Sequence, residues 1–249
     1  MIKRTLVETQ IGDVELYARK CPGDREVMKE VLMRDQWGLE ALDDSSFVPD
    51  LIFDIGANIG CFSALALKFW PESYVTAYEP HPLSFGLLNQ NLRKYKNQID
   101  LHLAAVTGRN LPNSFLQIST ESATDHPQCW DLNQEAERKI PDPSTQGFCY
   151  CNVVDINTLF DSVSTNTNLL VKIDTEGSEF YILEGLRPEN YKKISKLLVE
   201  IHGSQIAIPD YLQTTWKAVR GIVKDNMSET NLSGRHEINQ EQFILRASN

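Results

Sequence analysis

Residues 51–60 read LIFDIGANIG, and this stretch decides the fold. Leu51 to Ile55 is a short apolar run of the kind that forms a buried strand. The apolar segment 59–70, which ends before Pro71, is typical of a helix. A buried strand, a glycine loop and an apolar helix in this order predict the first unit of a parallel α/β sheet.

Strand-like and helix-like segments continue to alternate along the rest of the chain. This pattern predicts a three-layer α/β sandwich, with helices on both faces of a mostly parallel, seven-stranded sheet. The expected strands are residues 51–55, 74–78, 99–106, 114–118, 148–154, 169–173, 197–201 and 242–246. The expected helices are residues 59–70, 83–95, 156–163, 179–186 and 211–223.

We expect one domain, residues 1–249, because 249 residues suit one decorated α/β domain. An extension over residues 1–48 precedes the core of residues 49–249. The extension is predicted to hold a β-hairpin turning at Gly12-Asp13 and a helix over residues 24–43. Residues 107–147 form a polar insertion in the core, and its segment 120–147 is expected to form a mobile flap over a ligand site.

Composition indicates a soluble, cytoplasmic protein. No apolar run reaches the roughly 18 residues of a membrane span, and no signal-peptide pattern opens the sequence. With 24 basic and 34 acidic residues the net charge is −10, which disfavours nucleic acid and anionic membranes as partners. The five cysteines suit a reducing compartment, and we interpret them as thiols.

The glycine loop after the first strand is suited to an anion. Gly56 permits a sharp turn, Gly60 permits close helix packing, and the next helix N-terminus offers N–H groups. The spacing is G-x-x-x-G, with Asn58 where the dinucleotide fingerprint has a second glycine. A nicotinamide dehydrogenase is therefore disfavoured, and the carboxylate of a methionine moiety is one anion that suits such a loop. The alternative is a tight turn without a ligand.

A second strand end carries Glu79-Pro80, 25 residues after Asp54. A carboxylate in that place can accept both hydroxyls of an adenosine ribose. Pro80 fixes the backbone directly after it, which suits a positioned side chain better than a solvated surface glutamate.

A third strand end, residues 171–179, reads VKIDTEGSE. With residues 54–60 and Glu79-Pro80, it makes the chain resemble the FkbM family of methyltransferases. The strand 198–202 also matches the family's last core segment. The resemblance runs from about Leu51 to His202, with a gap over the insertion.

The resemblance implies a class I methyltransferase (Rossmann-like) fold, S-adenosylmethionine as the methyl donor, and O-methylation. The implied acceptor is a hydroxyl of a small molecule, a saccharide or a polyketide-like compound. Glu79 and Pro80 would hold the ribose, and Ala105, within segment 104–106, would border the adenine. The methionine pocket would be formed by Asp54, Gly56, Asn58 and Gly60, and Ala57 of the same loop would also bind the donor.

A neutral hydroxyl must lose its proton during methyl transfer, which requires a positioned base. Asp174 and His202 are expected at the ends of neighbouring strands, and Glu176 completes the set of catalytic candidates. His202 is the more natural base near neutral pH. The alternatives are a structural histidine at 202 and a helix N-cap at Asp174.

Two groups of residues have the ligand types of metal sites, but neither pattern favours a metal. Asp174, Glu200 and His202 could hold a divalent cation, but magnesium seldom takes histidine. The second group is His126 and Cys129 with Cys149 and Cys151, whose C-x-C spacing is tighter than zinc sites use. Two cysteines packed on one face of a strand explain the latter equally well.

An alternative function is a non-catalytic sensor or scaffold that binds a nucleoside on the same fold. The presence of both Asp174 and His202 argues against it.

Overall fold

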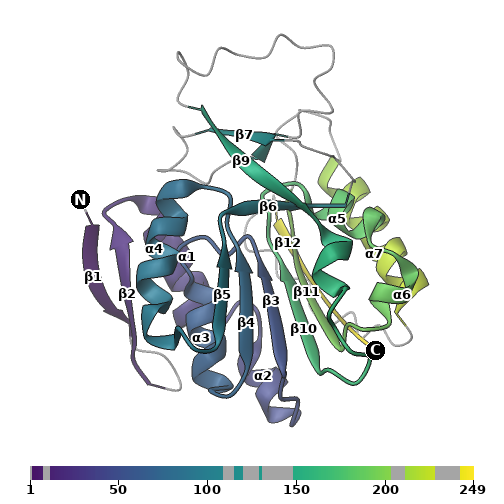
Figure 1. Ribbon diagram of the computed structural model, residues 1–249, viewed down its shortest axis with the longest axis horizontal. Helices are drawn as coiled ribbons and strands as arrows, with labels where there is room; N and C mark the ends of the chain where they lie inside the picture. Colours follow the sequence, from purple (N-terminus) through teal and green to yellow (C-terminus); the bar gives the residue numbers. More distant parts are fainter. Residues whose placement is uncertain are drawn as a thin grey trace.

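The computed structural model describes residues 2–7, 12–108, 115–119, 129–130, 148–202, 211–227 and 242–249. Its main sheet has six strands in the order β12-β11-β10-β3-β4-β5 (Figure 1). Neighbouring strands are parallel except for β11 and β12, which are antiparallel. The strands are β3 (Leu51–Ile55), β4 (Tyr74–Tyr78), β5 (Ile99–His102), β10 (Leu169–Ile173), β11 (Lys196–His202) and β12 (Gln242–Ser248).

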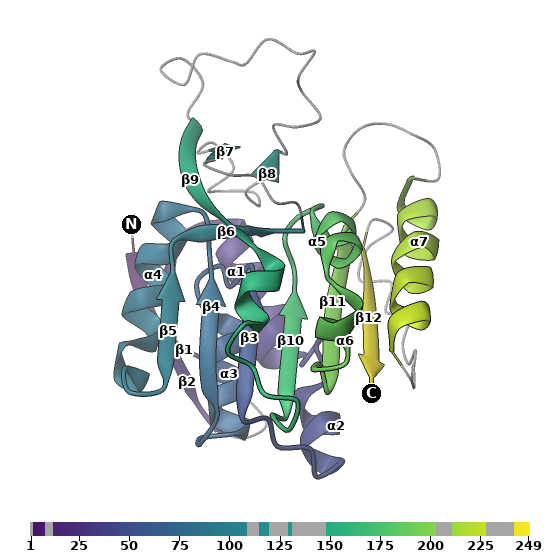
Figure 2. The same cartoon turned by 45° about the vertical axis from the view of Figure 1, so that its right-hand side comes forward.

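Helices cover both faces of this sheet (Figure 2). Side chains alternate between the faces, so that Ile52 and Leu170 pack in one apolar cluster while Phe53 and Val171 pack in the other. The first cluster contains residues of α3 (Cys61–Phe69) and α4 (Pro82–Leu92), together with the N-terminal extension. The second contains residues of η5 (Ile156–Phe160), α5 (Glu179–Gly185), α6 (Pro188–Tyr191) and α7 (Tyr211–Asn226).

The expectation of seven strands in one sheet was wrong. The segment 99–106 is two strands, because the chain leaves the main sheet after β5 and continues as β6 (Ala104–Thr107). β6 joins a second sheet of order β6-β9-β7-β8, which includes the strands expected near residues 114–118 and 148–154. Its other members are β7 (Phe115–Ser119), β8 (Cys129–Trp130) and β9 (Phe148–Asp155). Figure 1 shows β6 crossing over the carboxyl ends of the main-sheet strands.

The extension begins with the expected hairpin, formed by β1 (Ile2–Val7) and β2 (Val14–Arg19). The continuous helix expected over residues 24–43 was wrong. It is broken into α1 (Pro22–Met28), a π-helical turn η1 (Lys29–Met33) and α2 (Leu39–Asp44).

The break lies at Asp35 and Gly38, which have positive φ angles of 44° and 70°. The Asp35 carboxylate accepts the N–H groups of Leu39 and Glu40, each at 2.9 Å. These bonds satisfy the first N–H groups of α2, and Trp37 in the same turn is fully buried.

Among the described residues, no helix is both long enough and apolar enough to cross a bilayer.

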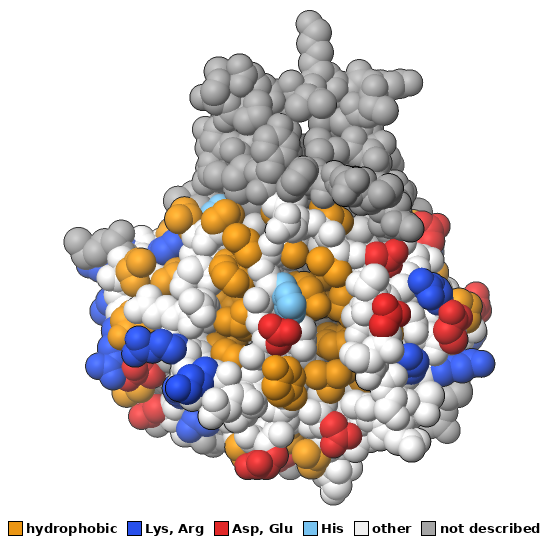
Figure 3. Space-filling view, viewed as in Figure 1, with side chains coloured by type: hydrophobic (Ala, Val, Ile, Leu, Met, Phe, Trp, Pro, Cys, Tyr) orange, Lys and Arg blue, Asp and Glu red, His pale blue; other side chains and the backbone are white. Residues whose placement is uncertain are grey.

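Figure 3 shows hydrophobic side chains gathered over the middle of one face, where Figure 1 places β3, β4 and β5. Tyr74 in β4 and Leu103 after β5 are among the exposed apolar residues.

Candidate active site

The strand order reverses between β3 and β10, because the chain runs from β3 toward β4 on one side and reaches β10 on the other. Open α/β sheets bind ligands at such a point, outside the carboxyl ends of the strands. A cavity of about 590 Å³, including space open to solvent, lies there. Its lining comes from three strand ends and from β6: Ile55, Gly56, Asn58, Tyr78, Glu79, Pro80, Ala104, Ala105, Val106, Asp174, Thr175, Glu176 and Ser178.

The glycine loop forms one wall of this cavity. Gly56 has φ 79°, and a Cβ there would come within 1.6 Å of the carbonyl oxygen of Asp174. Only glycine therefore allows the loop to pack against the end of β10. Asn58 also has a positive φ of 50°, and its buried Oδ1 has no hydrogen-bond partner among the described residues. Gly60 serves packing instead, since a Cβ there would lie 2.9 Å from Leu88 and the residue does not line the cavity.

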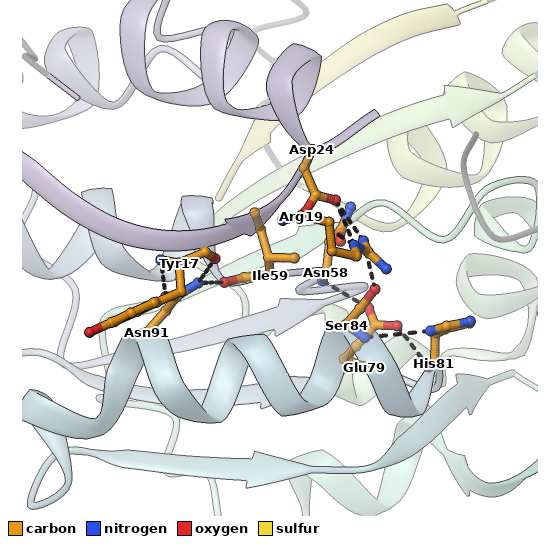
Figure 4. A network of polar contacts seen from close by, with 9 residues as sticks. All are labelled: Tyr17, Arg19, Asp24, Asn58, Ile59, Glu79, His81, Ser84 and Asn91. Atoms are coloured by element: carbon orange, nitrogen blue, oxygen red, sulfur yellow. Dashed lines mark hydrogen bonds and ion pairs between the residues drawn. The ribbon is translucent and has the colours of Figure 1, made fainter. Parts of the chain in front are cut away.

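Glu79 is 3% exposed, yet its carboxylate lines the cavity. Oε2 accepts the N–H of Asn58 and Oε1 accepts the N–H of His81, each at 2.8 Å (Figure 4). Burial raises the pKa of Glu79 to about 7, although both hydrogen bonds act to lower it. The carboxylate ties the glycine loop to the end of β4, and each oxygen keeps a lone pair for a further donor.

The extension is attached to the same region (Figure 4). Arg19 at the end of β2 forms an ion pair with the buried Asp24 at 2.6 Å, and its guanidinium also reaches Ser84 of α4. Asn91 of α4 accepts the N–H of Tyr17 at 2.6 Å and donates to the carbonyl of Ile59 at 2.7 Å. The extension, the glycine loop and α4 therefore form one hydrogen-bonded assembly.

Lys172 is the fourth of the five residues of β10 and is 2% exposed. Its Nζ donates to the carbonyl of Gly56 at 2.7 Å and lies 3.1 Å from Asp54 Oδ1 and 3.4 Å from Asp174 Oδ2. Burial alone would lower the pKa of Lys172, but the two carboxylates outweigh it and raise the pKa above its ordinary value. The ammonium therefore stays charged and links the ends of β3 and β10.

The loop after β10 is shaped by Glu179, whose side chain is 1% exposed. Its carboxylate accepts the N–H of Thr175 at 2.9 Å and the N–H of Gly177 at 3.0 Å. The loop includes Glu176 at φ 55°. Since α5 begins at Glu179 with Ser178 as its N-cap, the alternative that Asp174 caps this helix is wrong.

The structure brings most of the expected donor-binding residues together. Gly56, Asn58, Glu79, Pro80 and Ala105 line the main cavity, as do the catalytic candidates Asp174 and Glu176. Ala57 lines an adjoining cavity. Asp54 lines neither, because it is fully buried behind the loop, where Ser63 donates to it at 2.6 Å.

His202 ends β11, which is the parallel neighbour of β10 as expected. Its side chain is outside the described residues, as is most of the segment 120–147. The sequence interpretation passed over Lys172 as a functional residue. The sequence did contain an indication of this role, because a lysine inside an apolar strand needs a buried partner.

Among the described residues, no group of three or more His, Cys, Asp and Glu side chains is arranged to hold an ion. Asp174 and Glu200 both line the adjoining cavity. Of the zinc candidates, only the Cys151 side chain is described, and it is buried; His126 lies outside the described residues, as do the side chains of Cys129 and Cys149.

Comparison with known proteins places this site in a family. Methyltransferase 1 of Beauveria bassiana is 26% identical over 72% of this chain and 74% of its own length. The 31-O-demethyl-FK506 methyltransferase FkbM of Streptomyces tacrolimicus is 25% identical over 61% of this chain and 65% of its own. The hexuronic acid methyltransferase AglP of Haloferax volcanii is 24% identical over 76% of this chain and 71% of its own.

Among solved structures, the precorrin-6y C5,15-methyltransferase of Geobacter metallireducens superposes with a TM-score of 0.39 and 15% identity, over 92% of this chain and 91% of that one. The family assignment does not rest on this superposition. It rests on the family model for the methyltransferase FkbM domain, which matches residues 54–221 and so contains the glycine loop, Glu79 and the loop after β10. Because this match covers more than half of the sequence, the chain belongs to the FkbM methyltransferase family.

Proposed function

We propose that this chain is an S-adenosylmethionine-dependent O-methyltransferase whose acceptor is a hydroxyl of a small molecule, either a sugar or a polyketide-like compound. One observation carries the proposal. A buried carboxylate, Glu79, lines the same switch-point cavity as the glycine loop and the loop that contains Asp174. The relatives add support for the acceptor class, since two of them are named for 31-O-demethyl-FK506 and for hexuronic acid.

The donor site fits a nucleoside. Glu79 can accept the two ribose hydroxyls, because each of its oxygens receives a single N–H among the described residues. The unpartnered Oδ1 of Asn58 is a further acceptor in the wall. Ala104, Ala105 and Val106 offer small apolar side chains and backbone groups to a flat base. When bound, the donor supplies a methyl group activated by a sulfonium.

The chain's own contribution to the reaction is alignment and proton removal. A methyl group is transferred in line, so the acceptor oxygen must be held opposite the donor sulfur. Asp174 and Glu176 line the cavity at the end of β10, beside the glycine loop. We propose that the acceptor hydroxyl lies on this side and gives its proton to Asp174 or His202.

The test combines binding with turnover. Titration calorimetry with S-adenosylhomocysteine should show binding by the wild type. Mass spectrometry of ligands that co-purify would guide a screen of sugars and hydroxylated natural products with a methyl-labelled donor. The expected result is label on an acceptor oxygen. Label on nitrogen or carbon would refute O-methylation, and donor binding without turnover on any acceptor would favour the non-catalytic sensor.

A further inference from the structure

Of the two carboxylates beside the Lys172 ammonium, Asp174 is the accessible one. Its side chain is 24% exposed and lines both the main and the adjoining cavity, whereas the side chain of Asp54 is 0% exposed. The main chain of Asp174 is fixed, because its N–H donates to the carbonyl of Ile55 at 3.0 Å. Since the Cα–Cβ bond of an aspartate can rotate between staggered rotamers, the main chain alone does not set the direction of the carboxylate.

The ammonium of Lys172 provides a contact that can set this direction. Its Nζ lies 3.4 Å from Asp174 Oδ2, and it is held at the same time by the carbonyl of Gly56 at 2.7 Å and by Asp54 Oδ1 at 3.1 Å. Three acceptors therefore surround an ammonium that has three N–H groups. The lysine side chain is only 3% exposed, which suits a group that acts on a neighbouring side chain rather than on a ligand.

Two aromatic rings fix the ammonium from its other sides. Nζ lies 5.4 Å from the centroid of the Trp37 ring and 5.8 Å from that of Phe62. The two rings pack edge to face, with their centroids 5.8 Å apart. Arg246 donates to the main-chain carbonyl of Trp37 at 3.1 Å, so the first ring is itself held in place. The ammonium is therefore a fixed point toward which the Asp174 carboxylate turns.

We infer that Lys172 is a positioning residue for methyl transfer, which holds Oδ2 of Asp174 toward the glycine loop and so sets how the carboxylate faces the acceptor hydroxyl. This inference rests on the proposed function. A displacement of about 1 Å can cost roughly 10²-fold in rate. Loss of Lys172 should therefore reduce the rate of the transfer step and leave donor affinity nearly intact.

The test is made in an Asp54→Asn background, because Lys172→Met alone leaves the fully buried Asp54 without its partner. In this background Lys172 still has Asp174 as an ion-pair partner. Lys172→Gln then removes the ammonium and leaves only the partly exposed Asp174 charged, and the new amide can still donate to the Gly56 carbonyl.

Two quantities are compared between Asp54→Asn and Asp54→Asn/Lys172→Gln. The single-turnover rate, with the acceptor that takes label in the screen above, should fall about 10–100-fold. The Kd for S-adenosylhomocysteine should stay within about threefold in titration calorimetry. A loss that appears only in this Kd would overturn the inference, by assigning Lys172 to the donor loop.

A second pair of variants shows whether the effect passes through Asp174. Lys172→Gln is repeated in the Asp54→Asn/Asp174→Asn background, where it should cause no further loss of rate, because the group that it orients is gone. Equal losses in the two backgrounds would overturn the inference, since a purely structural role of Lys172 affects both alike.

Crystal structures of Asp54→Asn and Asp54→Asn/Lys172→Gln give a readout that does not depend on turnover. The Asp174 carboxylate should have one orientation in the first and more than one in the second. A single, unchanged orientation in both structures would overturn the inference.

Lys193→Gln in the Asp54→Asn background is the matched control. Lys193 also donates to a main-chain carbonyl, that of Phe160 at 2.8 Å, but it lines neither cavity. Its rate should equal that of Asp54→Asn, and a loss as large as that of Lys172→Gln would overturn the inference. Failure of the proposed function has a different signature, because the wild type would then transfer no label to an acceptor oxygen.

Discussion

The ammonium of Lys172 lies 3.1 Å from the carboxylate of Asp54, and the two side chains are 3% and 0% exposed. Lys172→Met should lower the free energy of unfolding by about 3–5 kcal/mol, because it leaves a buried carboxylate without its ion-pair partner. Urea denaturation measures the loss. Lys29→Met is the control, since the exposed pair with Glu26 is worth at most about 1 kcal/mol. Equal stability of the two variants would contradict the role given to Lys172.

Donor binding should depend on pH through Glu79. The pKa of Glu79 is raised to about 7 by burial, and the ribose hydroxyls donate to its ionised form. Affinity for S-adenosylhomocysteine should therefore rise from about pH 6 to about pH 8, with proton release on binding. Glu79→Gln should flatten this profile, and Glu79→Ala should weaken both S-adenosylmethionine and S-adenosylhomocysteine. Calorimetry in buffers of different ionisation enthalpy measures both effects; wild-type affinity in Glu79→Ala would refute the ribose contact.

The same group should shape the stability of the free protein. The pKa of Glu79 is raised from 4.5 to about 7, so the folded state holds the proton more tightly than the unfolded state. Its stabilising contribution is complete below pH 4.5 and is lost as the pH rises through about 7. The stability of the wild type relative to Glu79→Gln should fall over this interval in urea denaturation. A pH-independent difference would show that the carboxyl titrates normally.

Glu179 should matter for turnover without touching the ligand. Its carboxylate accepts the N–H groups of Thr175 and Gly177, and Glu179→Ala leaves both without this acceptor. The loop that carries Asp174 would shift, and a displacement of about 1 Å can cost roughly 10²-fold in rate. Initial rates with a labelled donor measure this. Glu184→Ala, at an exposed position of the same helix, should retain the wild-type rate.

Asp174→Asn and His202→Ala should each reduce the methyl-transfer rate by about 10²–10⁴-fold while donor affinity is nearly unchanged. Single-turnover rates and calorimetry separate the two quantities. Weaker donor binding with an intact rate in Asp174→Asn would assign Asp174 to the donor's ammonium. A wild-type rate in His202→Ala would make His202 structural, and normal rates in both variants would place the reaction elsewhere.

Local sequence was sufficient for the features that depend on neighbouring residues. Five-residue runs predicted β3, β4 and β10, and Gly56 provides the sharp turn and Gly60 the close helix packing that their positions suggested. Parallel strands place their carboxyl ends at one edge, so the residues after β3, β4 and β10 had to meet there. For this reason the cavity residues Gly56, Asn58, Glu79 and Asp174 could be named from the sequence.

The remaining features depend on contacts between distant segments. The apolar periodicity of segment 99–107 shows which of its residues are buried but not which strand they pair with. In the structure this segment forms two strands: β5 pairs with β4, and β6 pairs with β9. The helical pattern of residues 24–43 gave no weight to Asp35 and Gly38, whose positive φ angles break it. From the sequence, Trp37 is expected to be an ordinary core aromatic. In the structure, Arg246, 209 residues away, donates a hydrogen bond to the Trp37 carbonyl, and Trp37 lines a second cavity. The burial of apolar side chains sets the order of strands and helices along the chain, and this order can be predicted from the sequence. Hydrogen bonds between residues far apart in the sequence decide how these elements are arranged around a site.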